Sequence, residues 1–123
     1  MRPTASAAMF VIAYCTTGYA NDLPPKCNEN GSAPEINACA QEEFIEADKK
    51  LNHQYKILIS NLNSEDIALL RTEQRSWLKM RDPICREESK EYESTTGWIF
   101  WFNKCISAKT YHRTEELMRW RTE

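Results

Sequence analysis

The cysteines of this chain limit its fold more than any other residues. The sequence has five of them, and the first, Cys15, ends an apolar stretch over residues 5–15. A small-residue pattern ending at Ala20 follows this stretch, so we predict a secretory signal peptide over residues 1–20. Removal of the signal peptide leaves an even set of four cysteines in an exported chain, which is typical of two disulfides.

The four remaining cysteines are Cys27, Cys39, Cys85 and Cys105, and they allow three pairings. We favour Cys27 with Cys39 and Cys85 with Cys105, because each pair closes a short loop that contains Gly or Pro. On chain-entropy estimates each bridge contributes roughly 3 kcal/mol to stability. No metal site is expected, because the sequence has no CxxC pair and its two histidines stand apart.

Length and charge exclude several classes of protein. A chain of 123 residues holds one domain, and 16 basic against 18 acidic residues supply no surplus positive charge for nucleic-acid binding. Removal of Arg2 with the signal peptide changes the formal net charge from -2 to -3. The apolar stretch is shorter than the roughly 20 residues of a transmembrane helix. We therefore expect a periplasmic or secreted protein without stable membrane insertion.

The mature chain begins with an irregular arm and continues as a long helix. Residues 21–34 are rich in Pro, Asn and Gly, which predicts an irregular arm held by the first disulfide. A helix is then predicted over about residues 35–61, because apolar side chains recur at spacings of three and four. Its apolar stripe comprises Ala40, Phe44, Ala47, Leu51, Tyr55, Leu58 and Leu62.

A second helix is predicted to start near residue 65, with Ser64 as its N-cap. The short connection makes this helix antiparallel to the first. Pro83 lies inside the pattern, and we expect it to kink the helix near Met80 rather than end it. The inward-facing positions are Ile67, Leu70, Gln74, Trp77, Leu78, Arg81 and Cys85.

Residues 93–101 are predicted to form a loop or short turn, and a third helix follows over about residues 102–121. The fold class is therefore all-α: a small antiparallel bundle of three main helices with two disulfides. The helical domain spans residues 35–123, and the sequence shows no internal repeat and no second domain.

Several polar residues occupy positions that otherwise point into the bundle. A buried charge needs a partner, so we favour a structural hydrogen-bond and ion-pair network that fixes the helix register. Presentation to a ligand and simple surface exposure remain alternatives. The network residues are Gln74, Arg81 and Arg113, with Asp48, Tyr55 and Asp82 as their candidate partners.

Aromatic and acidic residues gather near the expected Cys85–Cys105 loop. Aromatic side chains on a rigid loop are good interface anchors, although they also serve to cap the open end of a bundle. Glutamates nearby offer charges for a cationic partner. The candidate partner-binding residues are Trp98, Phe100, Trp101, Glu91 and Glu93.

The sequence predicts no catalytic residue and no cofactor. It contains no GxSxG, no HExxH and no glycine-rich phosphate loop. The pairs Glu42–Glu43 and Glu115–Glu116 are interpreted as solvated helix surface rather than as an acid/base pair. We therefore expect a protein that is not an enzyme.

One segment of the second helix, with four later residues, resembles the LprI-type lysozyme-inhibitor domain of exported bacterial proteins. The segment is Gln74-Arg75-Ser76-Trp77-Leu78-Lys79-Met80-Arg81-Asp82-Pro83-Ile84-Cys85, and the later residues are Cys105, Thr110, Arg113 and Leu117. Residues of the first helix are similar to the same family: Asn37-Ala38-Cys39-Ala40, Ala47-Asp48, Leu51-Asn52 and Tyr55. The resemblance covers about residues 27–118 and implies an exported helical domain with two disulfides.

The resemblance implies that the protein is an inhibitor, and we expect it to cover the substrate cleft of a lysozyme-like muramidase. A net charge of -3 would favour approach to a basic partner. The alternative is an envelope structural, stress or immunity-type interaction domain that does not bind lysozyme.

Overall fold

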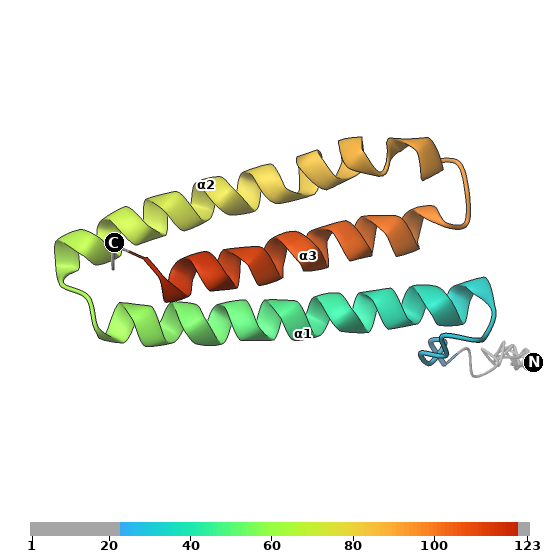
Figure 1. Cartoon of the computed structure of the whole chain (residues 1–123), viewed down its shortest axis with the longest axis horizontal. Helices are drawn as coiled ribbons and strands as arrows, with labels where there is room; N and C mark the ends of the chain where they lie inside the picture. Colours follow the sequence, from blue (N-terminus) through green and yellow to red (C-terminus); the bar gives the residue numbers. More distant parts are fainter. Residues whose placement is uncertain (1–22, 121–123) are drawn as a thin grey trace, which may run out of the picture.

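Three helices make up the fold in the computed structural model, which describes residues 23–120. They are α1 (Ala33–Ser60), α2 (Ser64–Glu88) and α3 (Trp98–Met118), with a short 3-10 helix, η1 (Lys90–Tyr92), after α2. Figure 1 shows α1 and α3 running in the same direction and α2 running against both. The structure confirms the predicted all-α bundle of three helices with two disulfides.

A local motif at Ser32 starts α1 two residues before the predicted position. The backbone N–H and the hydroxyl of Ser32 both donate to Oε1 of Glu35, at 3.3 and 2.9 Å. These hydrogen bonds lower the pKa of the Glu35 carboxyl. Pro34 lies in the first turn, where its missing N–H costs nothing. The signal peptide predicted over residues 1–20 lies outside the described residues.

Small residues let α1 and α3 pack closely. Of all helix pairs, α1 and α3 make the most extensive contact, and α3 lies between α1 and α2 in Figure 1. The buried positions of α1 include Ala40 and Ala47, and those of α3 include Ser107, Thr110 and Thr114. Helices with small side chains at their contact approach more closely than helices with large ones. The two threonine hydroxyls donate to backbone carbonyls of α3, four residues earlier.

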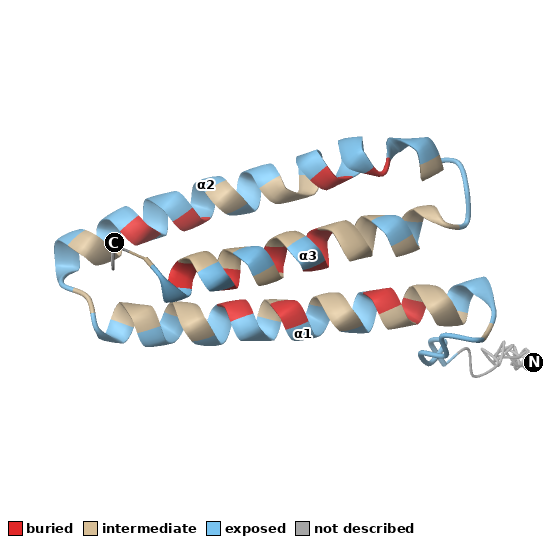
Figure 2. Cartoon of the chain, viewed as in Figure 1, coloured by how far each residue is buried: buried red, intermediate tan, exposed pale blue. Residues whose placement is uncertain are grey.

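The largest apolar cluster joins all three helices. Leu51 of α1, Leu70 of α2 and Leu117 of α3 are each at most 2% exposed. They are surrounded by partly buried residues: Tyr55, Leu58, Ile59, Leu62, Trp77 and Trp120. Leu70 lies near the start of α2 and Leu117 near the end of α3, so this core lies toward the α1–α2 connection. Figure 2 shows the other buried positions distributed along the inner faces of the helices.

The two disulfides lie toward the other end of the bundle, away from the α1–α2 connection. Cys27 of the arm is bonded to Cys39 of α1, and Cys85 of α2 is bonded to Cys105 of α3, with Cα–Cα distances of 4.4 and 5.6 Å. The pairing favoured from the sequence is therefore confirmed. Covalent links thus replace a large apolar core at this end of the molecule.

The second helix starts at Ser64, close to the predicted residue 65, but its predicted N-cap and the predicted start of the third helix were wrong. The N-cap of α2 is Asn63 and not Ser64, because the Asn63 Oδ1 accepts a hydrogen bond from the Asp66 N–H at 2.9 Å. The third helix begins at Trp98 and not at residue 102, because the rings of Trp98 and Phe102 stack one helical turn apart, 5.0 Å between centroids. Helix α2 does not end at Pro83 but continues to Glu88, which agrees with the part of the prediction that Pro83 would not end the helix. The kink predicted near Met80 stays a prediction. None of the helices in residues 23–120 is long and apolar enough to cross a membrane.

We predict that Asn63→Ala lowers the free energy of unfolding by about 1 kcal/mol, the usual value of an N-cap hydrogen bond. Ser64→Ala is the matched control and should change stability little, because the Ser64 side chain does not cap α2. Urea denaturation of both variants measures the difference. An equal loss in both variants would contradict the assignment of Asn63 as the cap.

We predict that replacing Cys85 and Cys105 together by Ala lowers the free energy of unfolding by about 3 kcal/mol, because the bridge closes a loop with a sequence separation of 20 residues. Chemical denaturation of the oxidised protein and the variant measures this loss. Unchanged stability would show that the bundle does not depend on this bridge.

Candidate functional site

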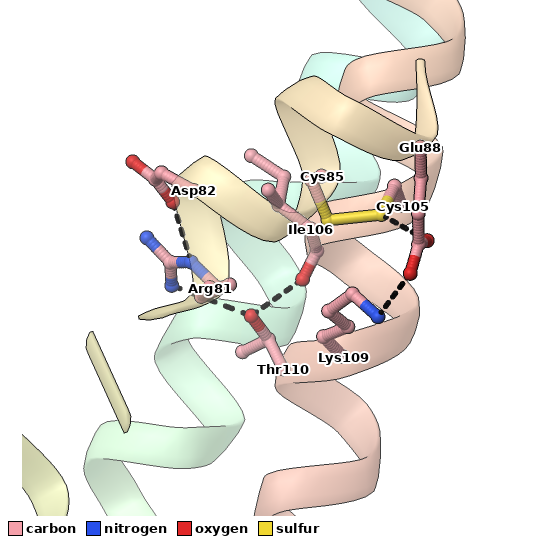
Figure 3. The surroundings of a disulfide bond; sticks show 8 residues. All are labelled: Arg81, Asp82, Cys85, Glu88, Cys105, Ile106, Lys109 and Thr110. Carbon is pink, nitrogen blue, oxygen red and sulfur yellow. Dashed lines mark hydrogen bonds and ion pairs between the residues drawn. A yellow bond between two sulfur atoms is a disulfide. The ribbon is translucent and has the colours of Figure 1, made fainter. Parts of the chain in front are cut away.

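An ion pair joins the end of α2 to α3 beside the second disulfide (Figure 3). Cys85 is fully buried, and Glu88 Oε2 lies 3.1 Å from the Cys105 sulfur. The Lys109 ammonium donates to Glu88 Oε1 at 3.0 Å, so an ion pair joins the same two helices as the disulfide. The sulfur atoms of Cys85 and Cys105 are bonded to each other. Cys85, Glu88 and Cys105 together therefore offer no thiolate that would bind a metal.

Arg81 links α2 to both other helices. Its Nε donates to Asp82 Oδ1 at 2.9 Å, and its Nη1 donates to the buried Thr110 hydroxyl of α3 at 3.4 Å. The guanidinium also lies over the rings of Phe44 and Trp77, 5.0 and 5.3 Å from their centroids. A side chain that is only 10% exposed thus has partners on α1, α2 and α3.

Arg113 forms a second polar cluster between α3 and α2. Its Nε donates to the buried Gln74 Oε1 at 2.9 Å, and its Nη1 donates to Glu116 Oε2 at 2.8 Å. His112 Nδ1 lies 3.2 Å from the other oxygen of Glu116. Gln74 and Arg113 were predicted members of the polar network, whereas Glu116 was interpreted as solvated helix surface. The spacing of Arg113 and Glu116 by three residues on one helix was the signal for their pairing.

Asp48 and Tyr55 are not among the hydrogen-bond partners of Arg81 and Arg113 within residues 23–120. Asp48 accepts a hydrogen bond from Asn52 at 3.3 Å, one turn later on α1. With Gln74 of α2, Asp48 and Tyr55 line a hollow of about 350 Å³ between α1 and α2. The six residues of the predicted network therefore form two clusters, Arg81–Asp82 and Gln74–Arg113, and two residues on the wall of this hollow.

The aromatic residues lie on the first turns of α3, so the predicted loop over 93–101 is correct for residues 93–97, which form turns, and wrong for residues 98–101. Trp101 stacks on Tyr92 of η1 at 5.2 Å and meets Phe100 edge-on at 5.0 Å. Trp98 is half-buried against Phe102, whereas Trp101 is 46% exposed. The cluster therefore both caps the end of the bundle and presents one large ring to solvent.

Two exposed acidic residues lie in the chain segment just before α3. Glu91 and Glu93 are both exposed, and Glu91 belongs to η1, which also carries Tyr92. A hydrogen bond to the Glu91 carboxylate raises the pKa of the Tyr92 hydroxyl. Because Tyr92 stacks on Trp101, this carboxylate lies near the aromatic surface that the sequence identified.

We predict that Gln74→Leu lowers the free energy of unfolding by about 1 to 3 kcal/mol, because it leaves the Arg113 Nε without its acceptor in a nearly buried position. Gln41→Leu, at an exposed position of α1, is the control and should have little effect. Thermal or urea denaturation compares the two. Equal stability of the Gln74→Leu variant and the unmodified protein would argue against a structural role for this cluster.

Comparison with known proteins identifies the family. Residues 26–117 match the family model "Lysozyme inhibitor LprI", which covers most of the chain. An uncharacterized protein of Rhizobium meliloti (strain 1021) is 25% identical over 130 residues, covering 95% of this chain and 94% of that protein. No solved structure matches the chain significantly. The matched segment includes both disulfides and all three helices, and the chain therefore belongs to the LprI lysozyme-inhibitor family.

Proposed function

We propose that this protein is exported to the periplasm or the medium and inhibits a lysozyme-like muramidase by covering its substrate cleft. Membership of an inhibitor family supports the class of function. Two disulfides in a small domain are typical of proteins outside the cytoplasm, which supports export. The predicted signal peptide over residues 1–20 is part of this proposal.

The proposed interface is centred on the exposed side chain of Trp101. A large ring that is already held by stacking on Tyr92 loses little conformational entropy when a partner covers it. Phe100, packed edge-on against Trp101, and the half-buried Trp98 lie on the same two turns of α3. Rigid aromatic side chains of this kind are frequent hot spots in protein interfaces.

Charge complements the aromatic surface. Glu91 belongs to η1 and its carboxylate is hydrogen-bonded to Tyr92, which stacks on Trp101, and Glu93 follows η1 directly. Many lysozymes are basic, so a negative rim would steer association and increase its rate at low salt. With the signal peptide removed, the whole domain adds a formal net charge of -3.

We predict that Trp101→Ala weakens muramidase inhibition at least tenfold, about 1.4 kcal/mol or more of binding free energy. Met118→Ala removes another exposed apolar side chain, at the far end of α3, and should leave inhibition unchanged. Trp101→Phe retains a ring for stacking on Tyr92 and should lie between the two. The purified oxidised protein and its variants are compared in a cell-wall lysis assay, with circular dichroism as the check on folding.

Unchanged lysis rates at micromolar excess of the unmodified protein, over several lysozyme types, would overturn the proposed function. Capture of a different envelope protein by the same surface would then favour the alternative, an envelope or immunity-type interaction domain. Full inhibition by Trp101→Ala would keep the function but place the interface elsewhere.

A further inference from the structure

A hollow lies beside the aromatic cluster and shares only Phe100 with the interface proposed above. The N-terminal arm, α1 and α3 enclose a hollow of about 800 Å³, open to solvent. Its walls include Glu29 of the arm, Glu42 of α1 and the aromatic residues Phe100 and Tyr111 of α3. Phe100 also packs against Trp101, so the hollow continues from the aromatic surface at the same end of the bundle.

The hollow holds more negative than positive charge. Four glutamates and two lysines line it, and two of the glutamates have cationic partners. Glu43 accepts from Lys104 of α3 at 2.6 Å, and Glu46 accepts from Lys49 at 2.9 Å. Within residues 23–120, Glu29 and Glu42 pair with no cation, and both side chains are exposed. Two carboxylates of the lining, one on the arm and one on α1, thus remain available to a cation from outside.

A contact within the hollow places a cation over one of its aromatic rings. The Lys50 ammonium lies over the ring of Tyr111, 5.4 Å from its centroid, and both residues line the hollow. Carboxylates and aromatic faces in one hollow favour a guanidinium, which forms bidentate hydrogen bonds with a carboxylate and stacks on a ring at the same time. The ring of Phe100 offers a second face on the same side of α3.

The wall that carries Glu29 is held in place. The Cys27–Cys39 disulfide fixes the arm on α1, with 4.4 Å between the two Cα atoms. Backbone hydrogen bonds connect the Asn28 N–H to the Glu35 carbonyl and the Gly31 N–H to the Asn28 carbonyl, at 3.4 and 3.0 Å. A wall formed before binding reduces the entropy cost of docking a charged segment.

We infer that this hollow docks an arginine-bearing segment of a protein partner, with the Glu29 and Glu42 carboxylates binding the guanidinium. The inference rests in part on the proposed function, because the basic rim of a muramidase would supply such a segment. The hollow extends the contact surface from the exposed Trp101 across Phe100 to the arm. It thereby adds selectivity for partners that carry arginine next to an apolar patch.

Titration of ¹⁵N-labelled oxidised protein with tri-arginine amide tests the inference by NMR. Chemical-shift changes should concentrate on the residues that line the hollow and should disappear at high ionic strength. The neutral analogue tri-citrulline amide, which has nearly the same shape, should leave the shifts unchanged. Glu29→Gln with Glu42→Gln should weaken peptide binding about fivefold, or about 1 kcal/mol for the two ion pairs together, since exposed ion pairs contribute little each.

Glu65→Gln with Glu115→Gln is the matched control, because it removes two exposed carboxylates at the other end of the bundle. Equal losses in the two double variants, equal binding of the citrulline peptide, or shifts centred away from the hollow would each overturn the inference. Localised peptide binding without inhibition of any muramidase would refute only the proposed function. Muramidase inhibition without localised peptide binding would refute only the role of the hollow.

Discussion

The disulfide between Cys85 and Cys105 is the constraint on which the position of the aromatic cluster depends. The apolar cluster of Leu51, Leu70 and Leu117 joins the helices near the α1–α2 connection, far from the proposed interface. At the other end, the disulfide and the Glu88–Lys109 ion pair hold α2 against α3. η1 and the first turns of α3 are formed by the chain between the two cysteines, so the aromatic surface has a rigid base.

Sequence patterns predicted most of the fold, because helix formation is largely local. The spacing of apolar residues around Leu51 defined α1, and the number and spacing of cysteines led to the observed pairing. The start of α3 was wrong because a run of aromatic residues after Gly97 was interpreted as a loop. Stacking of Trp98 on Phe102 across one turn stabilises that segment as helix. Their i, i+4 spacing is a helical signal, but the unbroken apolar run over residues 98–102 obscured it.

The candidate site was less predictable, because it depends on contacts between distant segments. Gln74 and Arg113 stood out as polar residues on apolar stripes, and they do lie together. Nothing in the sequence distinguished Thr110 as the acceptor for Arg81, or showed that Asp48 would accept a hydrogen bond from Asn52. The hollow beside the arm escaped prediction altogether, because it forms only when the Cys27–Cys39 disulfide places the arm against α1 and α3.

The central claim is that the disulfide-bearing end of the bundle is the binding surface for a basic muramidase. Hydrogen–deuterium exchange of the oxidised protein, with and without an inhibited muramidase, tests it most directly. We predict slower exchange on complex formation over residues 91–104 and over the arm with the first turns of α1. Protection confined to residues 58–72, around the α1–α2 connection, would contradict the claim.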